Sequence, residues 1–293
     1  MTEAAFGEEL RRWRTTRHLS QLELAIRSGT TQRHVSFLES GRSAPGRILV
    51  IRLAEALELA LRDRNALLHC AGYRPAYPQS DIADPALAPV RAALTQILEG
   101  HMPYPAIVAG PRGHVLMANA AFTVLLDGAD EALRTDPINV WRLALHPDGL
   151  ARRILNLAEW GRHVTDGLRA YQRRQPAPEL GELIGELEGY LPPPAPPDAG
   201  YLGVAVPLRL RTPEGELNLI TTLTSFATAV DVTLAELHLE AWLPADERTA
   251  DLLHRRHRAL QPGPSGAPFT ASPCCSRRTG SSGPTIPMTA SRG

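Results

Sequence analysis

The stretch SQLELAIRSGTTQRHVSFLESGR, residues 20–42, decides the architecture of the first part of the chain. Ser20 followed three residues later by Glu23 is the capping-box pattern that opens a helix. Gly29 supplies the left-handed residue that commonly closes one. Thr31 can then cap a second helix after a turn of about three residues. Two short helices joined in this way form a helix-turn-helix layout.

The second of these helices is polar on one face and apolar on the other. Val35 and Leu38 lie three residues apart and turn inward. The outward face presents groups that can read the major groove of DNA, where guanine suits Arg and adenine suits Gln, and flanking side chains can hold phosphates. A merely solvated face is the alternative for a short amphipathic helix. The residues predicted to bind DNA are Gln21, Thr31, Gln32, Arg33, Ser36, Phe37 and Arg42.

Apolar residues recur at helical spacing on both sides of this stretch, from residue 6 to residue 70. We therefore expect an all-α N-terminal domain of five short helices. Residues 73–89 are rich in proline, which favours extended backbone and predicts a semi-rigid linker.

Charge is segregated along the chain, although its formal net value is zero. Residues 1–80 hold 12 Arg and 8 acidic residues, a balance of +4, and residues 81–252 hold 13 Arg and 23 acidic residues, a balance of −10. The last part, residues 253–293, holds 6 Arg and no acidic residue. An acidic middle repels a polyanion, so contact with nucleic acid is expected from the N-terminal part.

Composition excludes several classes of protein. A length of 293 residues with 43% hydrophobic and 21% charged residues suits two globular domains, and neither a membrane span nor a secretory signal is seen, so we expect a cytoplasmic protein. The three Cys fit neither a disulfide framework nor a metal site, and His254 and His257 lack a third ligand. No nucleophile elbow or phosphate-binding loop is present. We therefore predict no catalytic residues, no metal, no cofactor and no enzymatic activity.

The second half of the chain mixes helical and strand patterns. After a helix at residues 90–99, the apolar runs YPAIVAG and HVLMANAAF, joined by GPRG, predict a hairpin with Asn119 capping the next helix. Residues 136–190 are helical, with an apolar stripe that starts at Leu150. The runs GVAVPLRL, ELNLITTLTSF and TLAELHLEAWL predict further strands, and PADERTADLL predicts a final helix. The expected fold is α+β, with about five antiparallel strands and helices packed on one face.

These patterns give the predicted domain boundaries. Residues 1–72 form the helix-turn-helix domain, 73–89 the linker, and 90–253 the α+β domain. Residues 254–293 form a tail rich in Arg, Pro, Ser and Gly that cannot bury enough apolar surface to order itself.

Residues 7–46 resemble the helix-turn-helix of the Xre-like repressor family. The SQ-x-x-LA opening, the small turn, the V-S-x-L-E-S-G-R segment and the following Pro match in order. The resemblance implies that Gln21 contacts a phosphate and braces the recognition helix, and that Gln32, Arg33 and Ser36 face base edges. It makes Glu39 a structural acid, tied to nearby backbone or Arg.

Residues 84–253 resemble the ligand-binding domain of MmyB-like regulators. The matching marks are YPAIV, the Asn119-Ala-Ala step, LHPDGL, Asn156 followed by Ala158-Glu159, and TLAELHLEAWLPAD. The resemblance implies a PAS-like sensor whose apolar cavity accepts a small lipophilic, fatty-acid-like molecule. The residues expected to bind this ligand are Ile107, Met117, Trp141, Leu143, His146, Trp160 and Phe226.

Together these features predict a sequence-specific transcriptional regulator. One short helix reads few bases alone, so we expect a homodimer that reads two half-sites of a palindromic operator in double-stranded DNA. Two alternatives stay open for the second domain. An enzyme domain would show a cluster of titratable groups in the cavity, whereas a protein-interaction module would bind a partner protein and no lipid.

Overall fold

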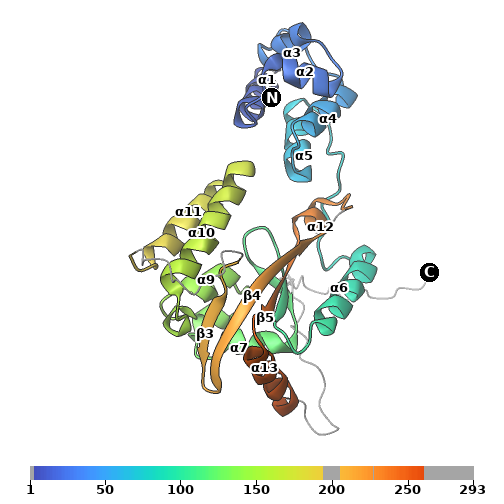
Figure 1. Ribbon diagram of the computed structural model, residues 1–293. Helices are drawn as coiled ribbons and strands as arrows, with labels where there is room; N and C mark the ends of the chain where they lie inside the picture. Colours follow the sequence, from blue (N-terminus) through green and yellow to red (C-terminus); the bar gives the residue numbers. More distant parts are fainter. Residues whose placement is uncertain (1–2, 194–204, 227, 261–293) are drawn as a thin grey trace, which may run out of the picture.

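The computed structural model describes residues 3–193, 205–226 and 228–260. Its N-terminal region is a bundle of five helices that share one apolar core, which includes Phe6, Leu10, Trp13, Val35 and Leu38 (Figure 1). The all-α prediction is confirmed. The helices are α1 (Glu3–Thr16), α2 (Gln21–Ser28), α3 (Gln32–Glu39), α4 (Arg47–Ala56) and α5 (Leu61–Cys70).

The predicted helix ends in this bundle are present. The Ser20 hydroxyl accepts a hydrogen bond from the Glu23 amide, and the Glu23 carboxylate accepts one from the Ser20 amide. Gly29 ends α2 with φ at 67°, and the Thr31 hydroxyl caps α3 by accepting from the amide of His34. Each of these caps satisfies backbone groups that the helix itself leaves unpaired.

The C-terminal region is built on one five-stranded antiparallel sheet, with strand order β2-β1-β5-β4-β3. The predicted α+β class and strand number are confirmed. The strands are β1 (Ala106–Ala109), β2 (Val115–Ala118), β3 (Leu208–Thr212), β4 (Gly215–Ser225) and β5 (His238–Pro244).

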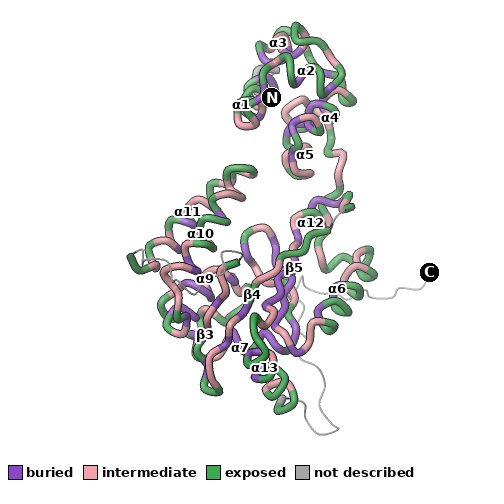
Figure 2. Tube along the Cα trace, in the orientation of Figure 1, coloured by how far each residue is buried: buried purple, intermediate pink, exposed green. Residues whose placement is uncertain are grey.

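Helices cover both faces of this sheet, not one face as the sequence suggested. Ile107 and Ala109 pack into the larger core with α9 (Val140–Leu145), α10 (Leu157–Arg174) and α11 (Pro178–Gly189). Their neighbours Ala106 and Val108 face α6 (Ala88–Gly100) in a smaller core. Figure 2 shows the buried residues gathered along the strands and the helix faces that meet them. The remaining elements are η1 (Pro85–Leu87), η2 (Ala120–Phe122), α7 (Thr123–Leu126), α8 (Glu131–Arg134), η3 (Ala151–Arg153), α12 (Val232–Glu236) and α13 (Glu247–Leu260).

Asn119 does not cap the next helix with its side chain, contrary to the prediction. It stands before η2, but its side chain makes no cap hydrogen bond there. Its carboxamide accepts from the amide of Ala106 and donates to the carbonyls of Leu98 and Tyr104. Asn119 is buried and joins the end of α6 to the start of β1.

Two segments differ from the predicted pattern, namely the start of the apolar helical stripe at Leu150 and the start of the strand run TLAELHLEAWL. The long helix begins at Leu157, because Asn156 uses its side chain to bond Pro207 and Arg209, and Ile154 forms a bridge with Leu210 of β3. The start of TLAELHLEAWL is the short helix α12, since Asp231 caps it by accepting from the amides of Thr233 and Leu234. Tertiary contacts at the sheet edge override the local pattern in the first case, and a side-chain cap does so in the second.

The proline-rich segment after α5 is held at several points. Asn65 binds the backbone of Ala76 and Tyr77, and the Tyr73 hydroxyl donates to the carbonyl of Pro45. The segment then meets α12, where the amide of Val232 donates to Pro78. At the other end α13 continues to residue 260, past the predicted boundary at 253. The tail predicted beyond that point lies outside the described residues.

Candidate functional site

The outer face of α3 is exposed where base contacts were predicted. Gln32 and Arg33 are exposed and Ser36 and Phe37 are half-buried, whereas Val35 lies fully inside the bundle. The Arg33 guanidinium lies 5.2 Å from the centre of the Phe37 ring, a cation–π contact. Figure 1 shows α3 at the end of the bundle that lies away from the sheet. The polar groups of this face are therefore free to meet another molecule.

Glu39 anchors the inner side of the same helix. Its carboxylate is buried and accepts from Arg14 Nε at 2.5 Å, Arg14 Nη2 at 3.0 Å and Gln21 Nε2 at 2.9 Å, with Arg11 Nε at 3.4 Å. Burial opposes ionisation, but the hydrogen bonds from Arg14 and Gln21 outweigh it, so the pKa of Glu39 lies below its ordinary value. This is the structural acid that the resemblance implied.

The other predicted DNA-binding residues surround the outer face of α3. Gln21 is half-buried at the start of α2, and its side-chain amide donates a hydrogen bond to Glu39, which holds α2 against α3. Thr31 is exposed at the start of α3, with its hydroxyl used as the cap. Arg42 is exposed just beyond α3, and its backbone amide donates to Phe37. All seven predicted residues thus belong to one part of the surface, around α3.

A cavity of about 670 Å³ lies where the sheet, α10 and α12 meet the N-terminal bundle. Leu59, Ala60, Leu61 and Arg62, at the start of α5, form part of its wall. Most of the other lining side chains are apolar or aromatic, and the volume is typical of a small-molecule site. The further lining residues include Trp141, Ala144, Trp160, Val164, Leu168, Tyr171, Ile220, Leu223 and Trp242.

Trp141 and Trp160 line this cavity, and the other five residues predicted for the ligand lie elsewhere. Ile107 and Leu143 are buried inside the larger core. Met117 packs on the opposite face of the sheet with α6, because its position on β2 alternates away from the cavity. His146 packs edge-on against Tyr190, and Phe226 is exposed beyond the end of β4.

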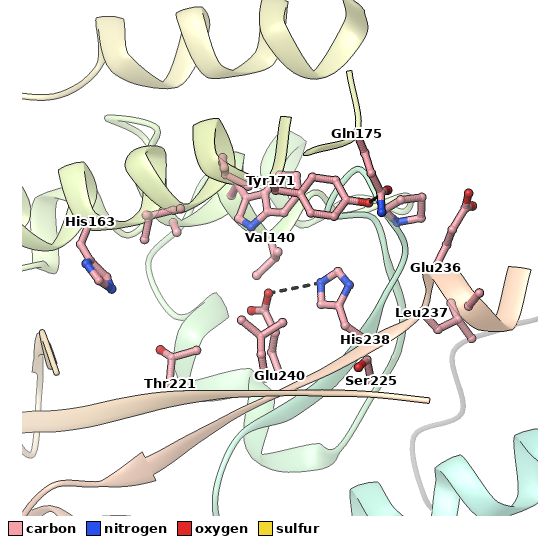
Figure 3. A pocket seen from close by; sticks show the side chains of 18 of the residues that line it. Val140, His163, Tyr171, Gln175, Thr221, Ser225, Glu236, Leu237, His238 and Glu240 are labelled. Atoms are coloured by element: carbon pink, nitrogen blue, oxygen red, sulfur yellow. Dashed lines mark hydrogen bonds and ion pairs between the residues drawn. The ribbon is translucent and has the colours of Figure 1, made fainter. Parts of the chain in front are cut away.

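The cavity also has polar groups that were not predicted from the sequence. His238 and Glu240 alternate with buried apolar residues along β5, and His238 Nε2 lies 3.4 Å from Glu240 Oε1 (Figure 3). His163 of α10 faces the same space. The period-two alternation of His238, Glu240 and Trp242 was the available signal. The wall is thus not purely apolar, and a titratable cluster of this kind was the feature expected of an enzyme.

The edge of the cavity joins the two regions of the chain. Arg62 of α5 donates from Nε at 2.6 Å and from Nη2 at 2.7 Å to the carboxylate of Glu236 in α12. These hydrogen bonds raise the pKa of the Arg62 guanidinium. Beside this pair the Ser80 amide donates to Asp231, and the Thr233 hydroxyl donates to the Ser80 carbonyl. Arg62 and Glu236 thus belong both to the wall of the cavity and to the contact between the two regions.

Two absences hold for the described part of the chain. It contains no group of three or more side chains that could hold a metal ion. None of its helices is both long and apolar enough to cross a bilayer.

Two protein-family models match the chain. Residues 90–255 match the MmyB-like transcription regulator ligand binding domain, and residues 10–63 match the helix-turn-helix family. No curated protein matches the sequence.

Solved structures provide three further similarities. The restriction-modification controller protein C.AhdI from Aeromonas hydrophila is 34% identical over 21% of this chain and 94% of its own, with a TM-score of 0.21. The clp gene regulator ClgR from Corynebacterium glutamicum is 25% identical over 35% of this chain and 96% of its own, with a TM-score of 0.22. An RNA-binding Light-Oxygen-Voltage receptor is 15% identical over 88% of this chain and 65% of its own, with a TM-score of 0.27.

Proposed function

The chain belongs to the family of the MmyB-like transcription regulator ligand binding domain, which matches more than half of its length behind a helix-turn-helix, and we propose that ligand occupancy of the cavity controls its binding to DNA. We propose that residues 1–72 and 90–253 act as the two domains, that residues 73–89 connect them, and that the protein works in the cytoplasm. The observation that carries the proposal is the cavity wall, to which both regions contribute.

The DNA half of the proposal rests on the exposed face of α3. Gln32, Arg33 and Ser36 lie where a recognition helix presents side chains to the major groove. Gln21 and Arg42 flank this face and are proposed to hold phosphates. We propose a homodimer that reads two half-sites of a palindromic operator, because a single helix of eight residues reaches few base pairs.

The ligand half rests on the apolar wall. Trp141, Trp160 and Leu168 present a surface that suits a small lipophilic molecule with a fatty-acid-like chain. Such a ligand changes DNA binding only if it prefers one arrangement of the two regions over another. Because Leu61 and Arg62 of α5 belong to the wall, a change in how α5 meets α12 changes the cavity.

The proposal is tested by selecting bound sequences from random duplex DNA with the wild-type protein, Arg33→Ala and Arg74→Ala. Arg74 is exposed in the linker, outside α3 and the residues predicted to bind DNA, and provides the matched loss of one charge. We expect wild type and Arg74→Ala to select the same palindrome. Arg33→Ala should lose the preference at one position per half-site, since a bidentate base contact contributes about 1–3 kcal/mol.

General attraction to DNA should fall only modestly in both variants. An unchanged preference in Arg33→Ala would mean that Arg33 does not read bases.

Native mass spectrometry of the purified protein tests the ligand half, and we expect a co-purified lipophilic molecule. A partner protein bound in its place would favour the interaction-module alternative.

A further inference from the structure

The cavity wall contains two carboxylates and one Arg side chain. Its charged side chains are Arg62, Glu236 and Glu240, and its imidazoles are those of His163 and His238. Arg62 is committed to Glu236 by two short hydrogen bonds. The carboxylate of the wall that has no Arg beside it is therefore Glu240.

Glu240 lies in the apolar part of the wall. It is 7% exposed, and on its face of the sheet it is paired with Ile107 of β1 and Leu223 of β4. Within the described part of the chain its one polar partner is His238, at 3.4 Å. Burial of a carboxylate is costly unless hydrogen-bond donors or cations compensate for the lost water, and one imidazole at this distance is modest compensation. The site therefore has capacity for a further donor.

A second polar atom on the same face also lacks a partner. Thr221 of β4 pairs with Trp242 and lines the cavity two pairs along the ladder from Glu240, on the same face of the sheet. Its hydroxyl is buried and has no hydrogen-bond partner among the residues that the structure describes. Figure 3 shows Thr221 and Glu240 pointing into the same space. The two oxygens can accept from one group with several N–H donors.

Aromatic rings complete the surroundings of this carboxylate. Trp242 follows two residues later on the same face of β5, and Trp141, Trp160 and Tyr171 line the cavity from the helices. Aromatic faces attract organic cations, and rings combined with a carboxylate are the usual surroundings of a bound ammonium group. The same surroundings disfavour a ligand carboxylate, which would enter a site of like charge.

We infer that the ligand of this cavity is an amphiphile with an apolar chain and an organic ammonium head, which Glu240 binds. The inference rests on the proposed function and specifies its ligand: the chain remains fatty-acid-like, but the polar end is a cation in place of a carboxylate. The chain then lies against the apolar wall. The head donates to Glu240, and Thr221 supplies a second acceptor.

The test compares decylamine, decanol and decanoate, which share one chain and differ in the head. Three of the four Trp line the cavity, so quenching of tryptophan fluorescence reports occupancy at pH 8 in the full-length protein. We expect decylamine to bind at least tenfold more tightly than decanoate, with decanol between them. A charge-assisted hydrogen bond is of this strength, and tenfold in affinity corresponds to about 1.4 kcal/mol.

Glu240→Gln keeps the shape of the side chain and removes its charge. It should reduce the preference for decylamine over decanoate about tenfold and leave decanol binding unchanged, whereas Glu131→Gln, at an exposed position outside the wall, should change neither. Decanoate binding as tightly as decylamine to the wild-type protein would overturn the inference, whether or not the variant folds, and leave the lipophilic site intact. Absence of binding by all three compounds would contradict the proposed lipophilic site itself.

Discussion

Glu39 shows what a single buried charge does for the recognition helix. Its carboxylate lies inside the bundle at 5% exposure and accepts from Arg14 of α1 and Gln21 of α2, so one side chain joins three helices. Hydrogen bonds to charged groups contribute about 1.5–3 kcal/mol each when their loss leaves a buried partner unpaired. Beside the core contacts of Val35 and Leu38, these bonds help to fix the orientation of α3 and with it the position of Arg33.

Glu39→Gln should therefore lower the free energy of unfolding of the N-terminal region by about 2–3 kcal/mol, since the amide replaces the charge that Arg14 requires. Urea denaturation followed by circular dichroism measures this loss. Glu8→Gln, at an exposed position of α1, is the control and should change the free energy of unfolding by less than about 0.5 kcal/mol. Equal stability of the two variants would show that the carboxylate is dispensable.

The same residue predicts a dependence on pH. The pKa of Glu39 is lowered by folding, so its stabilising effect is fully present above the ordinary value of 4.5 and is lost as the pH falls through the lower folded value. The difference in unfolding free energy between wild type and Glu39→Gln should therefore shrink below pH 4.5. A difference that stays constant down to pH 3 would contradict this account.

At the scale of elements, the turn of the β1–β2 hairpin lies against Trp141, which lines the cavity. Gly113 in its turn has φ at 74°, and a Cβ there would lie 2.7 Å from Cε3 of Trp141. Gly113→Ala should destabilise the protein by about 1–2 kcal/mol through backbone strain. It should also weaken decanol binding, because Trp141 must move and lines the cavity.

Gly110→Ala changes the same turn and is the matched control. An added Cβ at Gly110 meets no atom within 4 Å. Thermal unfolding and fluorescence titration should find this variant close to wild type. Comparable losses in both variants would show that the hairpin tolerates neither change and that the contact with Trp141 is not the cause.

Elements defined by local signals were predictable from the sequence, and those defined by distant contacts were not. The ends of α2 and α3 follow from Ser20, Gly29 and Thr31, whose cap bonds reach only three or four residues. The start of α10 depends on Asn156, which binds residues more than 50 positions away. An amide side chain does not reveal in the sequence which distant backbone it will meet.

The cavity was predicted less well than the helix face for the same reason. The outward face of α3 follows from helical periodicity within eight residues. The cavity requires the pairing of β4 with β5 and the approach of α5, so Glu240 could be assigned to a strand but not to a wall. Trp141 and Trp160 are the two predicted ligand-binding residues that do line the cavity. Both are large apolar side chains next to a core, where a cavity wall is also expected.

At the scale of the whole molecule, the question is how occupancy of the cavity reaches α3. Arg62 and Glu236 bridge α5 and α12 at the cavity edge, and α5 packs against α1 and α4 in the bundle that holds α3. Two sites are coupled when each ligand prefers the same arrangement, and the coupling factor is equal in both directions. If the Arg62–Glu236 pair distinguishes the arrangements, its loss should reduce this factor.

Arg62→Ala should therefore bring the ratio of decylamine affinities with and without operator DNA close to one. A loss of ligand affinity that is common to both conditions cancels in the ratio. A direct effect of Arg62, as a residue of the cavity wall, on decylamine affinity therefore does not change the ratio. Arg169→Ala is the control, because Arg169 is also 51% exposed and pairs with Glu188 inside the C-terminal region. We expect its ratio to equal that of wild type, and an unchanged ratio in Arg62→Ala would place the coupling in other contacts, such as those of Ser80 with Asp231 and Thr233.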